Sequence, residues 1–128
     1  MNQKLNDLLS KAYAPYSHFQ VAVILVTKDG RIFNGVNIEN TSYGATVCAE
    51  RVAIFKAISE GYGKGDFKEL HLMSSSHQES LPCFLCRQVF TEFMTGDEDL
   101  IIYTDKGNKT YKLSTLLPYP FVLEGSHA

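Results

Sequence analysis

The sequence contains no run of lysines or arginines long enough to follow a nucleic-acid backbone. Its 12 basic residues are outnumbered by 14 acidic ones, which gives a formal net charge of −2. Binding to a polyanion depends on clustered positive charge. The composition therefore predicts that nucleic acid is not a partner.

Long apolar segments are missing as well. No stretch approaches the roughly 20 apolar residues that a membrane-spanning helix needs, and the opening residues, MNQKLNDLLSKAYAP, lack the apolar run and cleavage site of a signal peptide. We therefore expect a cytoplasmic protein without a membrane partner. With 128 residues, 45% of them hydrophobic, the chain is long enough for one core, and residues 1–128 are predicted to form a single domain.

Cysteine is scarce, with three residues in all, and an odd number fits poorly with a set of structural disulfides. One cysteine stands in TVCAER, at position 48, and two stand in LPCFLCRQV, at positions 83 and 86. In a reducing compartment, closely spaced cysteines are more often metal ligands or redox groups. These three residues therefore indicate metal or redox chemistry.

Hydrophobic patterning predicts helices that alternate with strands. Apolar residues recur at helical spacing over residues 2–13, with Pro15 just beyond. Two β-branched runs flank Asp29-Gly30, which is a strong hairpin signal. Further helices are indicated in CAERVAIFKAISEG and CFLCRQVFTEFM, and further strands in FKELHLMSSS and DEDLIIYTDKG. This order favours helices packed on both faces of a mixed sheet, followed by a tail, STLLPYPFVLEG.

Both cysteine groups stand where a helix is predicted to begin. A helix N-terminus favours thiolate over thiol, because its partial positive charge and free N–H groups stabilise an anion. Two such helix starts facing each other would present Cys48, Cys83 and Cys86 to one Zn²⁺. Three thiolates leave the fourth zinc position free for water, as in catalytic sites. Zinc lowers the pKa of such a water to about 7.

A glutamate and two arginines complete this candidate site. Glu50, two residues after Cys48, reaches the same pocket without being a ligand, which suits a general acid–base. Three thiolates leave zinc with a net negative charge. Arg51 and Arg87 are nearby cations, expected to hydrogen-bond the sulfurs and moderate that charge.

Two other interpretations of the cysteines remain open at this point. A closed structural zinc site would use His77, six residues before Cys83, as its fourth ligand, but it would leave Glu50 without a role. A thiol redox protein would use Cys83 and Cys86 and would leave Cys48 idle. The other histidines are expected to be ordinary surface or structural residues: His18, His71 and His127.

Five segments resemble, in the right order, the small homotetrameric type of zinc-dependent cytidine deaminase: YAPYSHFQV, DGRIFNGVNIEN, SYGATVCAER, PCFLCRQV and LLPYPF. The resemblance runs from about Ala12 to Phe121. It implies a three-layer α-β-α sandwich with a mixed five-stranded sheet, one Zn²⁺ per chain, and a homotetramer with shared active sites. It also implies hydrolytic deamination of cytidine and 2′-deoxycytidine to uridine and 2′-deoxyuridine, with release of ammonia, in pyrimidine salvage.

The resemblance also assigns roles to individual residues. Cys48, Cys83 and Cys86 would bind zinc, and Glu50 would move the proton from the zinc-activated water to ring nitrogen N3 and then to the leaving amino group. The implied substrate contacts are Asn37 and Glu39 to the ribose 3′-hydroxyl, the Ala49 N–H to the base carbonyl, Phe19 beside the base, Phe121 from a neighbouring subunit, and Tyr43 closing that shared site.

The sequence departs from the family pattern in two places. Phe84 and Leu85 stand between the paired cysteines, where the family usually has Gly-x, and Ala22 stands after the strand valine, where it usually has Gly. This added bulk predicts a narrower pocket or altered packing. A sister family that deaminates antibiotic nucleosides such as blasticidin S shares the zinc motifs and the LLP tail. The pair Asn37-x-Glu39 argues against that alternative, because it recognises an ordinary ribose.

Overall fold

The computed structural model describes residues 1–123, so His127 lies outside the described residues. The elements follow one another in the order α1 (Asn2–Leu9), β1 (Val21–Thr27), β2 (Ile32–Val36), η1 (Tyr43–Ala45), α2 (Ala49–Ser59), β3 (Phe67–Ser74), α3 (Phe84–Phe93), β4 (Asp99–Thr104), β5 (Gly107–Lys112) and η2 (Leu113–Leu116). No helix in this part of the chain is long and apolar enough to cross a membrane.

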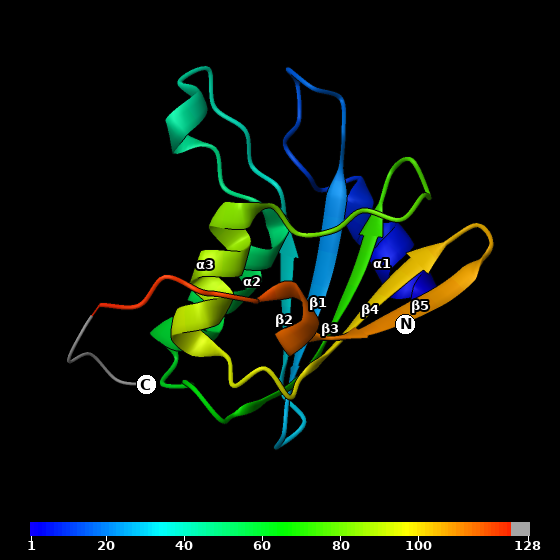
Figure 1. Cartoon of the computed structure of the whole chain (residues 1–128). Helices are drawn as coiled ribbons and strands as arrows, with labels where there is room; N and C mark the ends of the chain where they lie inside the picture. The colour runs from blue at the N-terminus through cyan, green and yellow to red at the C-terminus, as the bar shows by residue number, and fades with distance from the viewer. Residues whose placement is uncertain (124–128) are drawn as a thin grey trace.

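A five-stranded sheet runs through the molecule in the order β2-β1-β3-β4-β5 (Figure 1). Strands β3 and β4 are parallel, and the other neighbouring pairs are antiparallel. Parallel neighbours need a crossover connection, and α3 provides it between β3 and β4. The expected mixed sheet of five strands is confirmed.

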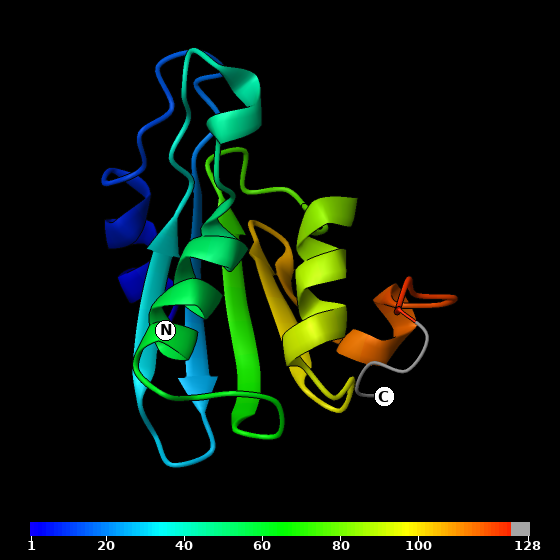
Figure 2. The ribbon, with the colours of Figure 1, turned by 90° about the vertical axis from the view of Figure 1, so that its left-hand side faces the viewer.

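Helices cover both faces of the sheet, as the alternating pattern predicts. Figures 1 and 2 show α2 and α3 together on one face and α1 on the other. The larger apolar cluster lies on the α2–α3 face and includes the buried Ile54, Leu72 and Phe90, while a smaller cluster under α1 includes Leu5 and Ile24. The fold is thus the expected three-layer α-β-α sandwich.

Helices α2 and α3 begin at the same end of the sheet, the upper end in Figures 1 and 2. Cys48 is the N-cap of α2 and Cys83 is the N-cap of α3, and both have an extended backbone. Gly61, with φ +97°, stands just after the end of α2, where a left-handed residue commonly ends a helix. Two cysteine motifs that are distant in the sequence are therefore brought to one end of the sheet.

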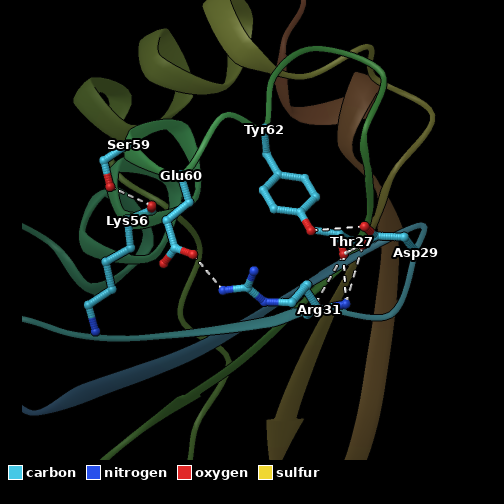
Figure 3. A network of polar contacts seen from close by, with 7 residues as sticks. All are labelled: Thr27, Asp29, Arg31, Lys56, Ser59, Glu60 and Tyr62. Atoms are coloured by element: carbon cyan, nitrogen blue, oxygen red, sulfur yellow. Dashed lines mark hydrogen bonds and ion pairs between the residues drawn. The ribbon is translucent and has the colours of Figure 1, made fainter.

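The predicted hairpin joins β1 to β2 and is anchored to the opposite end of α2 (Figure 3). Gly30 has φ +93°, a conformation that glycine adopts without strain. The Tyr62 hydroxyl donates to Asp29 Oδ2 at 2.9 Å, and Arg31 Nη2 donates to Glu60 Oε1 at 2.6 Å. These contacts fasten the hairpin to the segment that follows α2, at the end away from the cysteines.

The first helix is shorter than predicted. The apolar spacing predicts a helix over residues 2–13, but α1 ends at Leu9. Tyr13 is extended instead: its N–H donates to the Asn37 carbonyl at 3.0 Å, and its own carbonyl accepts the Glu39 N–H at 2.8 Å. This bridge keeps Tyr13 out of the helix, because its backbone cannot be helical and form the bridge as well. Between Leu9 and Tyr13, the N–H groups of Lys11 and Ala12 donate to carbonyls three residues back, which is a tighter turn than an α-helix.

Hydrophobic patterns do not predict β5. Its residues, GNKTYK, are polar and mostly exposed, so the strand has no apolar alternation. Its place comes from pairing with β4, where Thr110 stands opposite Ile101. Lys109 and Lys112 give this edge strand positive charge, which is a common protection against edge-to-edge pairing.

Candidate active site

Three cysteine sulfurs converge where α2 and α3 begin. Cys48 Sγ lies 3.7 Å from Cys83 Sγ, which lies 3.5 Å from Cys86 Sγ. All three sulfurs lie within 4.8 Å of one another. A tetrahedral Zn²⁺ with Zn–S bonds of about 2.3 Å holds its sulfurs about 3.8 Å apart. The donor type and the spacing therefore fit a zinc ion.

The surroundings of the thiols favour a thiolate at Cys48. A hydrogen bond with Cys86 lowers the pKa of Cys48 to about 5, and Arg51 adds to this effect with its Nη2 3.6 Å from Cys48 Sγ. The same contact with Cys48, together with burial, raises the pKa of Cys86. Because metals bind thiolates, Cys48 is prepared as a ligand.

His77 does not join the cysteines. Within residues 1–123, the group of side chains placed to hold a metal consists of the three cysteines. The backbone of His77, with φ +54°, is bonded to Ser74 and Asp105 in the loop after β3. The alternative of a closed structural site with His77 as fourth ligand is therefore wrong.

The two arginines differ in what they contact. Arg51 reaches the Cys48 sulfur, as expected. Arg87 instead donates from Nε to the Pro82 carbonyl at 2.9 Å, and its guanidinium carbon lies 4.8 Å from the centre of the Phe84 ring. An aromatic face attracts a guanidinium through a cation–π interaction. Phe84 therefore gives Arg87 a partner that the family's usual glycine lacks.

A cavity of about 270 Å³ opens beside the cysteines. It brings together residues of several separate motifs that the sequence singles out: Phe19, Asn37, Glu39, Cys48, Ala49, Glu50 and Cys83. Its volume is near the lower end of the range for small-molecule sites. The cavity is thus the place in which metal, carboxyl groups and a small ligand would meet.

Glu50 is the buried carboxyl group of this cavity. It stands in the first turn of α2 and is 5% exposed. Burial raises the pKa of Glu50 to about 7, and the negative charge of Cys48 adds to the rise. A carboxyl group with such a pKa both takes up and releases a proton near neutral pH, which general acid–base chemistry requires.

Asn37 is a buried residue, although its position just after β2 would suggest an exposed strand edge. Its Oδ1 accepts the Val21 N–H at 2.8 Å, and its Nδ2 donates to the Phe19 carbonyl at 2.8 Å. The next residue, Ile38, forms one β-bridge with Tyr13 and a second with Val47. The segment that follows β2 is therefore flanked by chain on both sides, and the Asn37 side chain forms part of the cavity wall.

Glu39, two residues further, is held in the same wall. Its Oε1 accepts the N–H groups of Tyr16 at 3.0 Å and Ser17 at 3.1 Å, and its Oε2 accepts the Ser17 hydroxyl. The hydrogen bond from the Ser17 hydroxyl is the main cause that lowers the pKa of Glu39. Glu39 is therefore an ionised group that also fixes the loop before β1.

Two of the predicted substrate contacts, Tyr43 and Phe121, do not line the cavity of their own chain. Tyr43, on η1, is 79% exposed, and Phe121, in the tail, is 66% exposed. Phe121 lines a separate groove of about 280 Å³ together with Phe84 and Arg87. Its carbonyl accepts a hydrogen bond from Gln88 Nε2 at 3.1 Å, which holds the tail along α3.

The departures from the family pattern do not narrow the cavity. Phe84 and Leu85 point outward at the start of α3 and are 81% and 66% exposed. Ala22 is buried under α1, because side chains alternate along a strand and its neighbour Val21 faces the cavity. The larger side chains are therefore present, but they lie on the outer surface of α3 and under α1, outside the cavity.

Several lining residues were not singled out by the sequence: Ser17, Val21, Thr46, Leu72, Ser80 and Leu81. Three of them lie inside the quoted segments YAPYSHFQV and SYGATVCAER, and Ser80 and Leu81 stand just before PCFLCRQV, so their place in or beside a motif was an available signal. Leu72 is different, because it comes from the middle of β3. Only the folded structure shows that Leu72 lies on the sheet face that α2 and α3 cover, and that it reaches the cavity from there.

Comparison with known proteins agrees with this geometry. A family model described as "Cytidine and deoxycytidylate deaminase zinc-binding region" matches residues 1–104. The cytidine deaminase of Halalkalibacterium halodurans is 42% identical over 114 residues, which are 88% of this chain and 85% of that protein. The probable cytidine deaminase of Dictyostelium discoideum is 45% identical over 116 residues, 88% of this chain and 76% of that protein. The crystal structure of cytidine deaminase from Burkholderia pseudomallei superposes with a TM-score of 0.87 at 38% identity, covering 93% of this chain and 94% of that chain.

Proposed function

The chain belongs to the family of zinc-dependent cytidine deaminases, and from this premise we propose that it deaminates 2′-deoxycytidine as well as cytidine, as a cytoplasmic enzyme of pyrimidine salvage. The products are 2′-deoxyuridine and uridine, and each turnover consumes one water and releases one ammonia. The observation that carries the proposal is that Glu50 and the Asn37–Glu39 pair line one cavity together with Cys48 and Cys83, two members of the three-cysteine cluster.

Proton movement falls to Glu50. Zinc held by Cys48, Cys83 and Cys86 would supply an acidic water molecule as the nucleophile for C4 of the base. Glu50 takes a proton from the nucleophile, delivers it to ring nitrogen N3, and then carries a proton to the leaving amino group. Its pKa of about 7 suits both uptake and release.

The base is oriented by the start of α2 and by an aromatic ring. Ala49 is the first residue of the helix, and N–H groups at this position have no partner within the helix. In the cavity wall, the Ala49 N–H donates to the base carbonyl, and the Phe19 ring lies beside the base. Both contacts are common to cytidine and 2′-deoxycytidine.

The sugar contact explains why both nucleosides are accepted. Asn37 uses one of its two N–H groups on Phe19, so one remains. A carboxylate has about four acceptor sites, and Glu39 uses three on Tyr16 and Ser17. One donor and one acceptor are left, which is the complement of a hydroxyl group. The 3′-hydroxyl occurs in both sugars, so this contact does not discriminate between them.

The charges of the cavity favour nucleosides over nucleotides. The described lining includes the carboxyl groups of Glu39 and Glu50 and contains no lysine or arginine. A phosphate group would meet like charge and find no cationic partner, which costs several kcal/mol in comparable settings. We therefore expect kcat/KM for 2′-deoxycytidine 5′-monophosphate to lie on the order of 100-fold or more below that for 2′-deoxycytidine.

Assembly into a homotetramer with shared sites is also part of the proposal. Large apolar side chains are exposed around the start of α3 and along the tail: Phe84, Leu85, Tyr119, Phe121, Val122 and Leu123. Such a patch is typical of a protein–protein interface. In the tetramer, Phe121 closes the cavity of a neighbouring chain, and Tyr43 contributes to the same closure.

Complementation tests the shared site. Mixed tetramers of Glu50→Ala and Phe121→Ala chains should regain activity that neither parent has, because an intact cavity forms between a Phe121→Ala chain, which retains Glu50, and a Glu50→Ala chain, which retains Phe121. Light scattering should give four chains per particle. A fully active monomer would contradict the shared site.

The reaction itself is tested by the loss of cytidine absorbance with purified protein, with zinc and ammonia quantified in the same samples. We expect about one zinc per chain, turnover of both nucleosides with matching ammonia release, and loss of turnover after chelation that Zn²⁺ reverses. Turnover of blasticidin S without turnover of cytidine would instead favour the antibiotic-nucleoside family.

A further inference from the structure

Gly35, in β2, lies directly under the first turns of α2. A Cβ atom at this position would stand 2.2 Å from the Ala49 carbonyl oxygen, 2.8 Å from the Ala53 nitrogen and 3.1 Å from Ala53 Cβ. The two nearest atoms belong to the backbone, so no side-chain rotation relieves the contact. The missing side chain is therefore what lets the helix approach the strand this closely.

Glycine is required here for space and not for backbone conformation. The glycines with positive φ in the described chain are others, among them Gly30 and Gly61. Gly35 pairs with Val23 in the regular antiparallel register of β1 and β2. A residue with a side chain would therefore fit the backbone of β2, and only the helix above excludes it.

The close approach is confined to the start of α2. Phe33, two residues earlier on the same face of β2, carries a full aromatic side chain in the core on the α2 side. On the helix, the fully buried alanines recur every four residues, at Ala49, Ala53 and Ala57. Gly35 meets the first two of them. The turn that rests on Gly35 is the one that begins at the Cys48 N-cap.

We propose that Gly35 is a positioning residue for the active site: its lack of a Cβ atom sets the depth of the first turn of α2, and with it the positions of Cys48 and Glu50 relative to the cysteines of α3. For a Cβ to stand 3.0 Å from the Ala49 oxygen instead of 2.2 Å, the turn would have to move by about 0.8 Å. The Cys48 sulfur is 3.7 Å from that of Cys83, so such a shift is large for a metal site.

The same displacement acts on Glu50. A shift of about 1 Å between reacting groups lowers a rate by about 100-fold. The statement about Glu50 rests on the proposed function, whereas the statement about Cys48 depends only on the metal site. The two parts therefore need separate measurements.

The experiment compares four variants of the full-length protein. Gly35→Ala adds the excluded Cβ, and Gly63→Ala is its control, because a Cβ there meets no atom within 4 Å. Ala53→Ser adds a single atom from the helix side of the same contact. Ala57→Ser makes the identical change one turn further from Cys48, at an equally buried position. Each protein is loaded with Zn²⁺ for kinetics and with Co²⁺ for absorption spectroscopy, and its thermal unfolding is followed.

Displacement of the first turn should change the thiolate-to-cobalt and d–d absorption bands of Gly35→Ala. It should lower kcat for cytidine by about 10- to 100-fold per metal-loaded chain, with a smaller effect on KM. Ala53→Ser should show the same changes to a lesser degree. Gly63→Ala should behave as the wild type. Ala57→Ser should lower the Tm while leaving the cobalt spectrum and kcat unchanged.

Wild-type cobalt bands and kcat in Gly35→Ala would overturn the proposal. If Gly35→Ala fails to fold, the serine pair decides: equal losses of kcat in Ala53→Ser and Ala57→Ser would mean general destabilisation, not positioning. The cobalt spectrum separates this inference from the proposed function. Altered bands in a protein whose wild type leaves cytidine untouched would support the positioning of Cys48 and contradict the deaminase mechanism.

Discussion

Recognition of the 3′-hydroxyl by Asn37 is tested by one change in the protein and one in the substrate. Asn37→Ala removes the amide that bonds the Val21 N–H and the Phe19 carbonyl, each at 2.8 Å. The nucleoside 3′-deoxycytidine lacks the hydroxyl that the remaining Asn37 N–H is proposed to meet. The exposed Asn34, three residues earlier in β2, provides the control variant Asn34→Ala.

The structure sets the size of both effects. Asn37 is 9% exposed, and truncation leaves the Val21 N–H and the Phe19 carbonyl, both only partly buried, without their partner. A fully buried unpaired group costs about 1–3 kcal/mol, so two partly buried groups predict a loss of about 1–3 kcal/mol in total in the free energy of unfolding. A neutral hydrogen bond to the substrate contributes about 0.5–1.5 kcal/mol, or about 2- to 13-fold in kcat/KM.

The assay measures kcat/KM of wild type and Asn37→Ala on cytidine and on 3′-deoxycytidine, with urea unfolding of both proteins. A general loss of activity through loosening of the strand cancels in this cycle, because it affects both substrates alike. The wild type should prefer cytidine by more than the variant does, and Asn34→Ala should match the wild type. An identical preference in wild type and Asn37→Ala would refute the reasoning.

Two further predictions concern pH and the core. Burial lowers the pKa of His71, even beside Glu69, so the folded protein favours the neutral imidazole. The unfolded chain binds this proton more readily, so the free energy of unfolding is highest above about pH 6.5 and falls as the pH drops below that value. Urea unfolding should show a larger loss from about pH 7.5 to about pH 5.5 for the wild type than for His71→Gln, and equal losses would argue against this. Phe90 is a fully buried residue of α3 in the larger apolar cluster, so Phe90→Ala should lower the free energy of unfolding by about 3–5 kcal/mol and Phe90→Leu by less than about 1.5 kcal/mol. A value for Phe90→Ala within the Phe90→Leu range, measured in urea, would contradict the packing.

Local signals were enough to place each cysteine motif at a helix start, while the meeting of the two starts was an inference from the chemistry that three thiols share. Each cysteine motif stands at a helix start, and helix starts are readable from sequence because the capping residue and the following apolar spacing are neighbours in the chain. The turn at Asp29-Gly30 and the end of α2 near Gly61 are predicted for the same reason. Both rest on a glycine with positive φ.

Features that depend on contacts with other parts of the molecule were not predictable from the sequence. The extended backbone of Tyr13 depends on its bridge to Ile38, and β5 depends on pairing with β4. The placement of Arg87 on Phe84 is a local contact, three residues apart on α3, and it depends on a ring that the family usually lacks. Asn37 and Glu39 show the same limit, because only the resemblance placed them near the substrate before the structure showed them buried in the cavity wall.

The role of Glu50 is the central claim, and the most direct measurement is the turnover of cytidine by wild type and Glu50→Gln with zinc quantified in both. The account predicts about one zinc per chain in each protein and a kcat that falls by about 10²- to 10⁴-fold in Glu50→Gln, because the metal site remains while the proton carrier is lost. Wild-type turnover by a zinc-loaded Glu50→Gln protein would contradict it.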